Sequence, residues 1–210
     1  MKKLSLILFT TAINMIYAQE FKPFVGKMVY AVDFTDSIGK IPLQTTYMTL
    51  LTNDTIVRIE AESNQIGKQI TIRHLTLNKY YILLEINQQK FAIQHQASAD
   101  TSASKYTFKS KMGKKKFCGL KANKVSVSNP NFKDGIPAYY FKNYSPKYLE
   151  ALKGIQGLPV DYYLQTEEGF YHYKLIEFKE EKISRDLFGI PSDYQKVTFD
   201  EFMKSVMKTN

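Results

Sequence analysis

Apolar and polar side chains alternate along most of this chain, and this period of two constrains the fold more than any other feature. Val57, Ile59 and Ala61, for example, are separated by charged residues. Successive side chains of a β-strand point to opposite faces of a sheet, so the pattern predicts strands with one buried face. Strands are expected at residues 28–34, 46–51, 57–61, 70–72, 80–86, 91–93, 106–108, 117–127, 136–141, 158–165 and 170–178.

Short helices are expected at two places between and after the strands. Ser145 precedes Pro146, a typical start with serine as N-cap and proline at the first helical position, and this helix is expected to end at Gly154. Thr198 and Glu201 form a capping box for a second helix. Because helices and strands do not alternate, the predicted fold is mostly β with two or three short helices, and its antiparallel sheet is expected to curl into a sandwich or barrel.

The N-terminus has the features of a secretory signal peptide. Lys2 and Lys3 precede an apolar run that extends to Ile16, and a small residue, Ala18, occupies the expected cleavage position. We therefore predict a signal peptide at 1–18, a single β-rich domain at 19–210, and export to the periplasm, cell surface or medium. No later segment is long and apolar enough to predict a transmembrane span. The alternative for residues 1–18 is a short buried helix.

Positive charge is spread along the chain and becomes dense at one place. Without residues 1–18, 27 basic side chains remain against 20 acidic ones. Five lysines lie at positions 109–116 around Gly113, which is expected to be a hairpin turn. This basicity fits attraction to anionic lipid, lipopolysaccharide or nucleic acid, or an ordinary lysine-rich surface, and export argues against nucleic acid. Cys118, the only cysteine, is interpreted as a small core residue of a strand.

The sequence contains no recognisable catalytic or metal-binding motif. His74, His95 and His172 fall in three different predicted strands and lack the short spacing of a zinc site. Nucleophile, phosphate-loop and metalloprotease motifs are absent. We therefore predict that the protein is not an enzyme and uses no cofactor or metal. A hydrolase with dispersed catalytic residues is an alternative that would need convergent polar groups in one cleft.

Several short motifs resemble those of exported Bacteroidota proteins of unknown function. They are KKFCGLKA at residues 115–122, GLP at 157–159, LFGIPSDY at 187–194 and FVGK at 24–27. The first three are similar to motifs of the family named for its Gly-Leu-Pro-Gly-Leu-Ile sequence and of a related family. This resemblance implies a half-barrel like that of periplasmic lipoprotein carriers, in which a curved sheet holds acyl chains on its concave face.

Together these observations predict a non-catalytic binding protein with a lipid or other apolar ligand in the concave face of a curved sheet. The alternative is a structural or protein-interaction module of the cell envelope that binds no ligand. A cavity of about 300–1,000 Å³ would distinguish the first from the second. The candidate ligand-binding residues are Met28, Tyr30, Val32, Tyr80, Ile82, Leu84, Tyr139 and Phe141.

Overall fold

Twelve strands hydrogen-bond into one continuous sheet in the part of the chain that the computed structural model describes, residues 20–63, 67–77, 79–96, 106–130 and 132–207. The predicted signal peptide at 1–18 lies outside these residues. The strands are β1 (Val25–Thr35), β2 (Gln44–Asn53), β3 (Ile56–Ser63), β4 (Gly67–His74), β5 (Lys79–Ile86), β6 (Gln89–Gln96), β7 (Thr107–Phe117), β8 (Leu120–Asn129), β9 (Phe132–Phe141), β10 (Leu158–Gln165), β11 (Phe170–Glu180) and β12 (Gln195–Thr198). The helical elements are η1 (Pro146–Tyr148), η2 (Arg185–Phe188) and α1 (Phe199–Met207).

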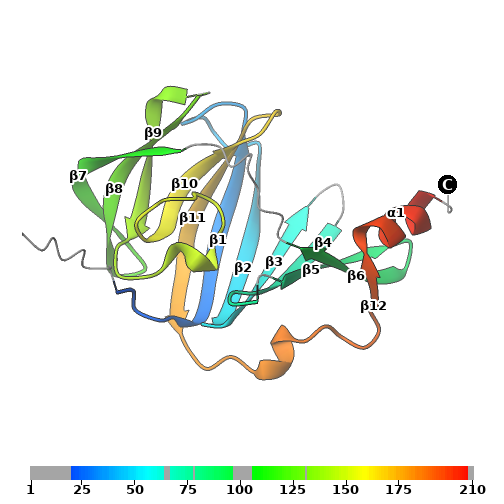
Figure 1. The fold of residues 1–210 in the computed structure, drawn as a ribbon. Helices are drawn as coiled ribbons and strands as arrows, with labels where there is room; N and C mark the ends of the chain where they lie inside the picture. Colours follow the sequence, from blue (N-terminus) through cyan, green and yellow to red (C-terminus); the bar gives the residue numbers. More distant parts are fainter. Residues whose placement is uncertain (1–19, 64–66, 78, 97–105, 131, 208–210) are drawn as a thin grey trace, which may run out of the picture.

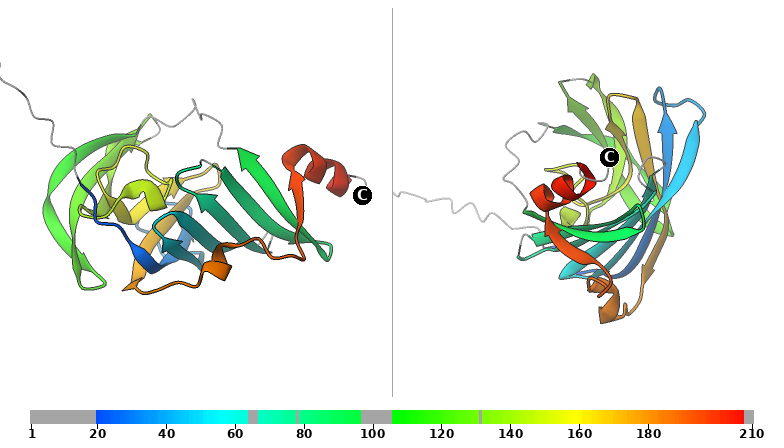
Figure 2. Two further views of the ribbon diagram at one scale, coloured as in Figure 1. Left: turned by 60° about the horizontal axis from the view of Figure 1, so that its bottom comes forward. Right: turned by 90° about the vertical axis from the view of Figure 1, so that its right-hand side faces the viewer.

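The sheet is curved and open (Figures 1 and 2). Its strand order is β12-β6-β5-β4-β3-β2-β1-β11-β10-β9-β8-β7, and all neighbours are antiparallel except β12, which runs parallel to β6. The pairing of β1 with β11 joins the two halves of the chain at the centre of the sheet. Register shifts at Val29/Tyr30 and at Pro159/Asp161 mark bulges, which increase local twist and bending. The predicted mostly β, curved antiparallel fold class is confirmed.

The segment between β9 and β10, residues 142–157, packs into the hollow of the curved sheet (Figure 1). It contributes five buried side chains to the main core: Tyr144, Tyr148, Leu149, Leu152 and Ile155. These side chains belong to one cluster with fully buried residues of β1, β2 and β3, including Tyr30, Leu50 and Val57. The protein's own side chains therefore fill much of the concave face.

The far end of the sheet, β4–β6, is covered on both faces. On one face, Leu84 and Phe91 pack with Phe202 of α1. On the other, Leu83 and Ala92 belong to a cluster completed by residues that follow η2. This second cover is tied to the sheet because Arg58 donates a hydrogen bond of 2.9 Å to the carbonyl of Leu187. No helix among the described residues is long and apolar enough to cross a membrane.

Of the two predicted helices, the C-terminal one is confirmed and the other is much shorter than expected. Thr198 accepts a hydrogen bond from the backbone of Glu201, whose carboxylate accepts from Thr198 in return. The helix predicted from Ser145 to Gly154 is a single turn, η1, although Ser145 does cap it through the N–H of Lys147. The carbonyl of Lys147, which a longer helix would use internally, accepts from Arg73 at 2.5 Å instead.

The prediction of a hairpin turn at Gly113 is wrong. β7 continues through Gly113 to Phe117, and the chain reverses at Cys118 and Gly119, whose φ angles are 48° and 82°. Two consecutive positive φ angles are typical of a type I′ hairpin turn. The interpretation of Cys118 as a core residue is therefore also wrong, because Cys118 is exposed at this turn. The lysines at 109–116 lie along an edge strand and not at a hairpin tip.

Candidate functional site

The structure divides the eight candidate ligand-binding residues among several environments. Met28, Tyr30, Val32 and Phe141 lie together in the main core and are at most 7% exposed. Ile82 and Leu84 pack in the separate cluster beneath α1.

The remaining two candidates make ring contacts, and Tyr139 does so at the border of the main core. Tyr80 stacks on His95 with ring centroids 4.7 Å apart, and Tyr139 lies 5.7 Å from the ring of Phe117. The structure thus brings five of the eight residues together in or against the main core, and only Val32 among all eight also lines the pocket described next.

A pocket of about 440 Å³ opens beside Val32, where β1, β2, β3 and β11 lie next to each other in the sheet. Its residues are Val32, Phe34, Gln44, Thr46, Tyr47, Met48, Ala61, Glu62, Glu168, Tyr171 and Tyr173. Val32 and Met48 belong to the main core, against which Tyr171 and Tyr173 pack. The apolar wall of the pocket is therefore continuous with the core of the protein. We call this the β1–β11 pocket.

The register of the central strands explains why these residues converge. Val32 pairs with Tyr173 of β11 on one side and with Thr46 of β2 on the other. Phe34 pairs with Tyr171, and their rings lie 5.1 Å apart. Directly opposed side chains of an antiparallel pair project from the same face, so β11 supplies tyrosines beside the apolar residues of β1.

The charged residues that line the β1–β11 pocket are both acidic. Two of its lining residues, Glu62 and Glu168, carry carboxylates, and none is lysine, arginine or histidine. Gln44, Thr46 and Tyr47 add neutral hydrogen-bonding groups. A pocket with an apolar wall and a polar, acidic border favours a ligand that has an apolar part and a head without negative charge.

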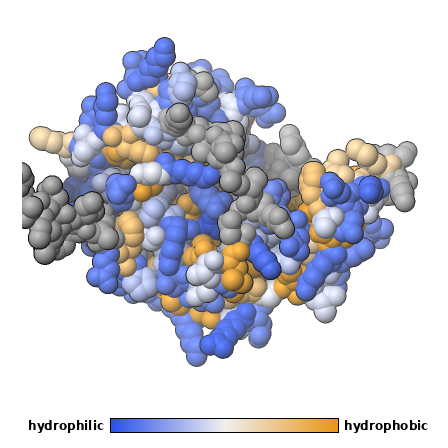
Figure 3. Space-filling view, viewed as in Figure 1, coloured by the Kyte–Doolittle hydropathy of each residue, from blue (hydrophilic) through white to orange (hydrophobic). Residues whose placement is uncertain are grey.

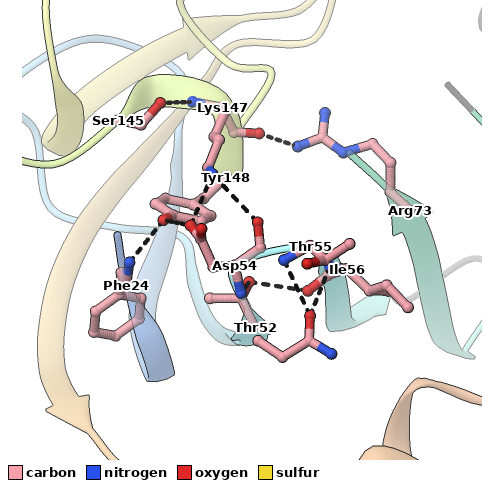
Figure 4. Close-up of polar contacts among 10 residues, drawn as sticks. Phe24, Thr52, Asp54, Thr55, Ile56, Arg73, Ser145, Lys147 and Tyr148 are labelled. Atoms are coloured by element: carbon pink, nitrogen blue, oxygen red, sulfur yellow. Dashed lines mark hydrogen bonds and ion pairs between the residues drawn. The ribbon is translucent and has the colours of Figure 1, made fainter. Parts of the chain in front are cut away.

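At the opposite side of the hollow, η1 is anchored to the sheet by a buried tyrosine (Figure 4). The hydroxyl of Tyr148 accepts a hydrogen bond of 2.8 Å from the backbone N–H of Phe24 and donates one to the carboxylate of Asp54. Burial raises the pKa of Tyr148, and the Asp54 carboxylate raises it further. Tyr148 therefore remains a protonated donor at any physiological pH.

Asp54 also forms an ion pair with a neighbouring lysine (Figure 4). Lys147 Nζ lies 2.7 Å from the Asp54 carboxylate and 3.2 Å from its backbone carbonyl. Burial by itself would raise the pKa of Asp54, but the hydrogen bonds from Lys147 and Tyr148 outweigh it and lower the pKa below 3.8. Arg73 completes the anchor, because it binds both the Lys147 carbonyl and the carboxylate of Glu150. These contacts tie η1 and the residue Glu150 beyond it to Phe24, to β4 and to the turn between β2 and β3.

A second polar cluster lies around His172 of β11. His172 Nε2 is 2.7 Å from Asp161 Oδ1, and its Nδ1 is 4.0 Å from Asp33 Oδ2. Asp161, only 7% exposed, also binds Lys115 at 3.3 Å, and Tyr163 stacks on the His172 ring at 4.2 Å. Burial raises the pKa of Tyr163, and the charges of Asp161 and Asp33 add to this effect.

The His172 cluster gives no support for the hydrolase alternative. An Asp–His–Asp arrangement resembles catalytic polar groups, but none of Asp33, Asp161 and His172 lines the β1–β11 pocket. Nor do the described residues hold any group of three or more ligating side chains that could bind a metal ion. The contacts of His172 are those of a structural network around a nearly buried carboxylate, to which Lys115 also binds.

Some hydrophobic side chains are exposed on the face of the molecule that Figure 3 shows. They appear there in separate patches, one of them at the α1 end, with hydrophilic side chains between them. The β1–β2 connection carries another group of strongly exposed apolar residues, because Ile41 is 87% and Leu43 69% exposed. These residues lie between Phe34 and Gln44 in sequence, both of which line the β1–β11 pocket.

Sequence reasoning missed most of the pocket. Phe34 belongs to the apolar file that begins at Met28, and Tyr171 and Tyr173 fall in the strand predicted at 170–178. The alternation did not reveal that β1 pairs with β11, which brings together residues about 140 positions apart. Strand neighbours at that separation leave no local signal in one sequence.

Comparisons with known proteins agree on the fold. Two crystal structures of PNGF-II, in space groups C2 and P21, each superpose with a TM-score of 0.51, at 16% and 13% identity. The alignments cover 86% and 87% of this chain but 32% and 33% of PNGF-II, so the chain spans about a third of that protein. No protein-family model matches the sequence, and no curated protein does. At these identities, the chain shares a fold with part of PNGF-II, and this likeness assigns it no activity.

Proposed function

We propose that this protein is a non-catalytic binding protein that holds an amphipathic ligand in the β1–β11 pocket. The observation that carries the proposal is the pocket itself, whose volume of about 440 Å³ lies within the range of small-molecule sites, about 300–1,000 Å³. Its wall joins core residues such as Val32 to the aromatic rings of Tyr171 and Tyr173. Each methylene buried there would contribute about 0.8 kcal/mol.

The charge around the pocket narrows the ligand class. Glu62 and Glu168 would repel a carboxylate or phosphate head, and no cation in the lining offsets them. The proposed ligand is therefore an apolar group with a neutral or cationic head, and a free fatty acid anion is disfavoured. Gln44 and Thr46 can bind hydroxyl or amide groups of such a head.

Export and likeness to lipoprotein carriers are parts of the same proposal. They rest on the leader-like residues 1–18 and on the motifs at 115–122, 157–159 and 187–194. A curved sheet with a pocket on its core-facing side suits a carrier, although residues 142–157 occupy much of the space in which a carrier would hold long acyl chains. N-terminal sequencing of protein recovered from the cell envelope should give Gln19 as the first residue.

Two direct measurements test ligand binding. Organic extracts of the purified mature protein should contain an amphipathic molecule that mass spectrometry identifies. A neutral fluorescent probe, N-phenyl-1-naphthylamine, should bind more tightly than the carboxylated probe cis-parinaric acid. Extracts without such a molecule, together with no binding of either probe, would refute the proposal. Tighter binding of the carboxylate would refute the charge argument.

A protein-interaction module is the second candidate, and one observation favours it. The exposed apolar side chains of the β1–β2 connection, Ile38, Ile41 and Leu43, form a small surface that a partner protein could cover. Replacing Ile41 and Leu43 with serine should then abolish cross-linking to an envelope protein in cells while leaving probe binding unchanged. Loss of probe binding alone would indicate instead that this connection serves the pocket.

A further inference from the structure

A second hollow lies where the end of β9 meets the β7–β8 hairpin, and it shares no lining residue with the β1–β11 pocket. Its volume is about 710 Å³. Its residues are Ser110, Lys111, Met112, Gly113, Lys114, Gly119, Leu120, Lys121, Asn123, Lys124, Tyr140, Phe141, Lys142, Asn143 and Tyr144. The list contains five lysines and no acidic residue, so the potential in this hollow is strongly positive. We call it the lysine hollow.

A bulge in β7 brings these lysines together. Ser110 pairs with Val125 and Lys114 with Asn123, so the segment between Ser110 and Lys114 is longer than the segment opposite. The extra residues include Lys111 and Met112, which are displaced from regular pairing. Gly113 adopts a φ of 122° within this bulge, a conformation that L side chains rarely adopt.

Protection of an exposed sheet edge explains only part of this arrangement. β7 is an edge strand, and lysines along an edge hinder pairing with other chains. That role requires lysines on β7 alone. The lysine hollow also receives Lys121 and Lys124 from β8, an interior strand whose edges are both paired. Lysines from an interior strand facing the same hollow indicate a site for negative charge.

Two exposed apolar side chains accompany the lysines. Met112, which lines the hollow, is 97% exposed, and Leu120, at the hairpin end, is 37% exposed. A surface that combines lysines with protruding apolar side chains is typical of proteins that lie on a membrane interface, where ammonium groups bind lipid phosphates and apolar groups enter the acyl boundary. A soluble polyanion would give the apolar side chains no partner.

We propose that the lysine hollow and its border bind an anionic phospholipid surface. Lys111, Lys114, Lys121 and Lys124 bind the headgroup phosphates, while Met112 and Leu120 insert among the lipids. This site is independent of the β1–β11 pocket, so either can be correct without the other.

The test measures co-sedimentation with vesicles of phosphatidylcholine alone and of phosphatidylcholine containing one third phosphatidylglycerol. Binding should require phosphatidylglycerol and weaken as salt is raised. Changing the four lysines to glutamine should lower the affinity at least roughly tenfold. The matched control changes four exposed lysines that lie outside the lysine hollow, Lys79, Lys182, Lys196 and Lys204, to glutamine, which alters net charge equally. The control should bind nearly as wild type.

A tryptophan reporter tests the geometry without removing any charge. The natural chain contains no tryptophan, so Met112→Trp introduces a single one. Its fluorescence should shift to the blue with anionic vesicles, whereas that of Leu187→Trp should not. Equal binding to neutral vesicles, equal losses in both lysine variants, or binding of dextran sulfate in place of vesicles would overturn the proposal.

Discussion

Tyr148 donates its phenolic hydrogen to the carboxylate of Asp54, a residue 94 positions earlier in the chain. This one bond joins η1 to the turn between β2 and β3. Because the same hydroxyl accepts the Phe24 N–H, three distant segments meet at one oxygen atom (Figure 4). Near η1, the concave face of the sheet is thus covered by residues that are hydrogen-bonded to it, whereas the β1–β11 pocket remains open.

Removing the Tyr148 hydroxyl should destabilise the protein. Tyr148→Phe leaves the Phe24 N–H and the Asp54 carboxylate each without this partner, and we expect a loss of about 1.5–3 kcal/mol in the free energy of unfolding. Urea denaturation measures it. Tyr144→Phe is the matched control, because its hydroxyl binds the exposed Glu180 and should contribute less than about 1 kcal/mol. Equal losses would contradict the anchoring role of Tyr148.

The same anchor should weaken in acid. The pKa of Asp54 lies below its ordinary value of 3.8 in the folded protein, so the ionised carboxylate favours folding. This contribution should be complete above roughly pH 5 and decline as the pH falls through the folded-state pKa. Asp54→Asn, which keeps an acceptor and tolerates the φ of 70°, should lack it. The difference in unfolding free energy between wild type and variant should therefore shrink in acid, and a constant difference would disprove the linkage.

Gly26 should be far less tolerant of substitution than another glycine of positive φ. An alanine Cβ at Gly26 would lie 2.1 Å from the backbone oxygen of Lys179, so β1 and β11 would have to separate. At Gly39 no atom lies within 4 Å, and only the backbone strain of about 1–2 kcal/mol remains. Thermal unfolding should show a larger loss for Gly26→Ala than for Gly39→Ala. The reverse order would argue against the β1–β11 pairing.

The His172 cluster should act as a coupled structural pair. His172→Ala leaves the Asp161 carboxylate with one partner fewer in a poorly solvated position, and the expected cost is about 1.5–3 kcal/mol. Asp161→Asn combined with His172→Ala should cost less than the sum of the two single changes. A double-mutant cycle in urea measures this coupling. Additive losses would show that the contact contributes little.

The strands were predictable because their alternation is local. The file from Met28 to Phe34 and the alternation at 57–61 each report burial within a few residues, and both are confirmed as strands. The C-terminal helix was predictable for the same reason, since its capping box spans only Thr198 to Glu201.

The predictions of the turn at Gly113 and of the helix after Ser145 were wrong because contacts between residues distant in sequence determine the structure there. Gly113 and Gly119 both offer a turn, and pairing of β8 with β9 and β7 selects the second. The helix predicted from Ser145 fails beyond η1 because Arg73 takes the Lys147 carbonyl. The β1–β11 pocket depends likewise on a strand pairing that no local pattern encodes.

Blocking the β1–β11 pocket is the most direct test of the proposed function. Thr46→Phe places a ring into the pocket, whereas Thr49→Phe, on the same strand but outside the lining, is the matched control. Titration with N-phenyl-1-naphthylamine should show saturable binding to wild type and to Thr49→Phe, and at least roughly tenfold weaker binding to Thr46→Phe. Unchanged binding to Thr46→Phe would contradict the claim that this pocket holds the ligand.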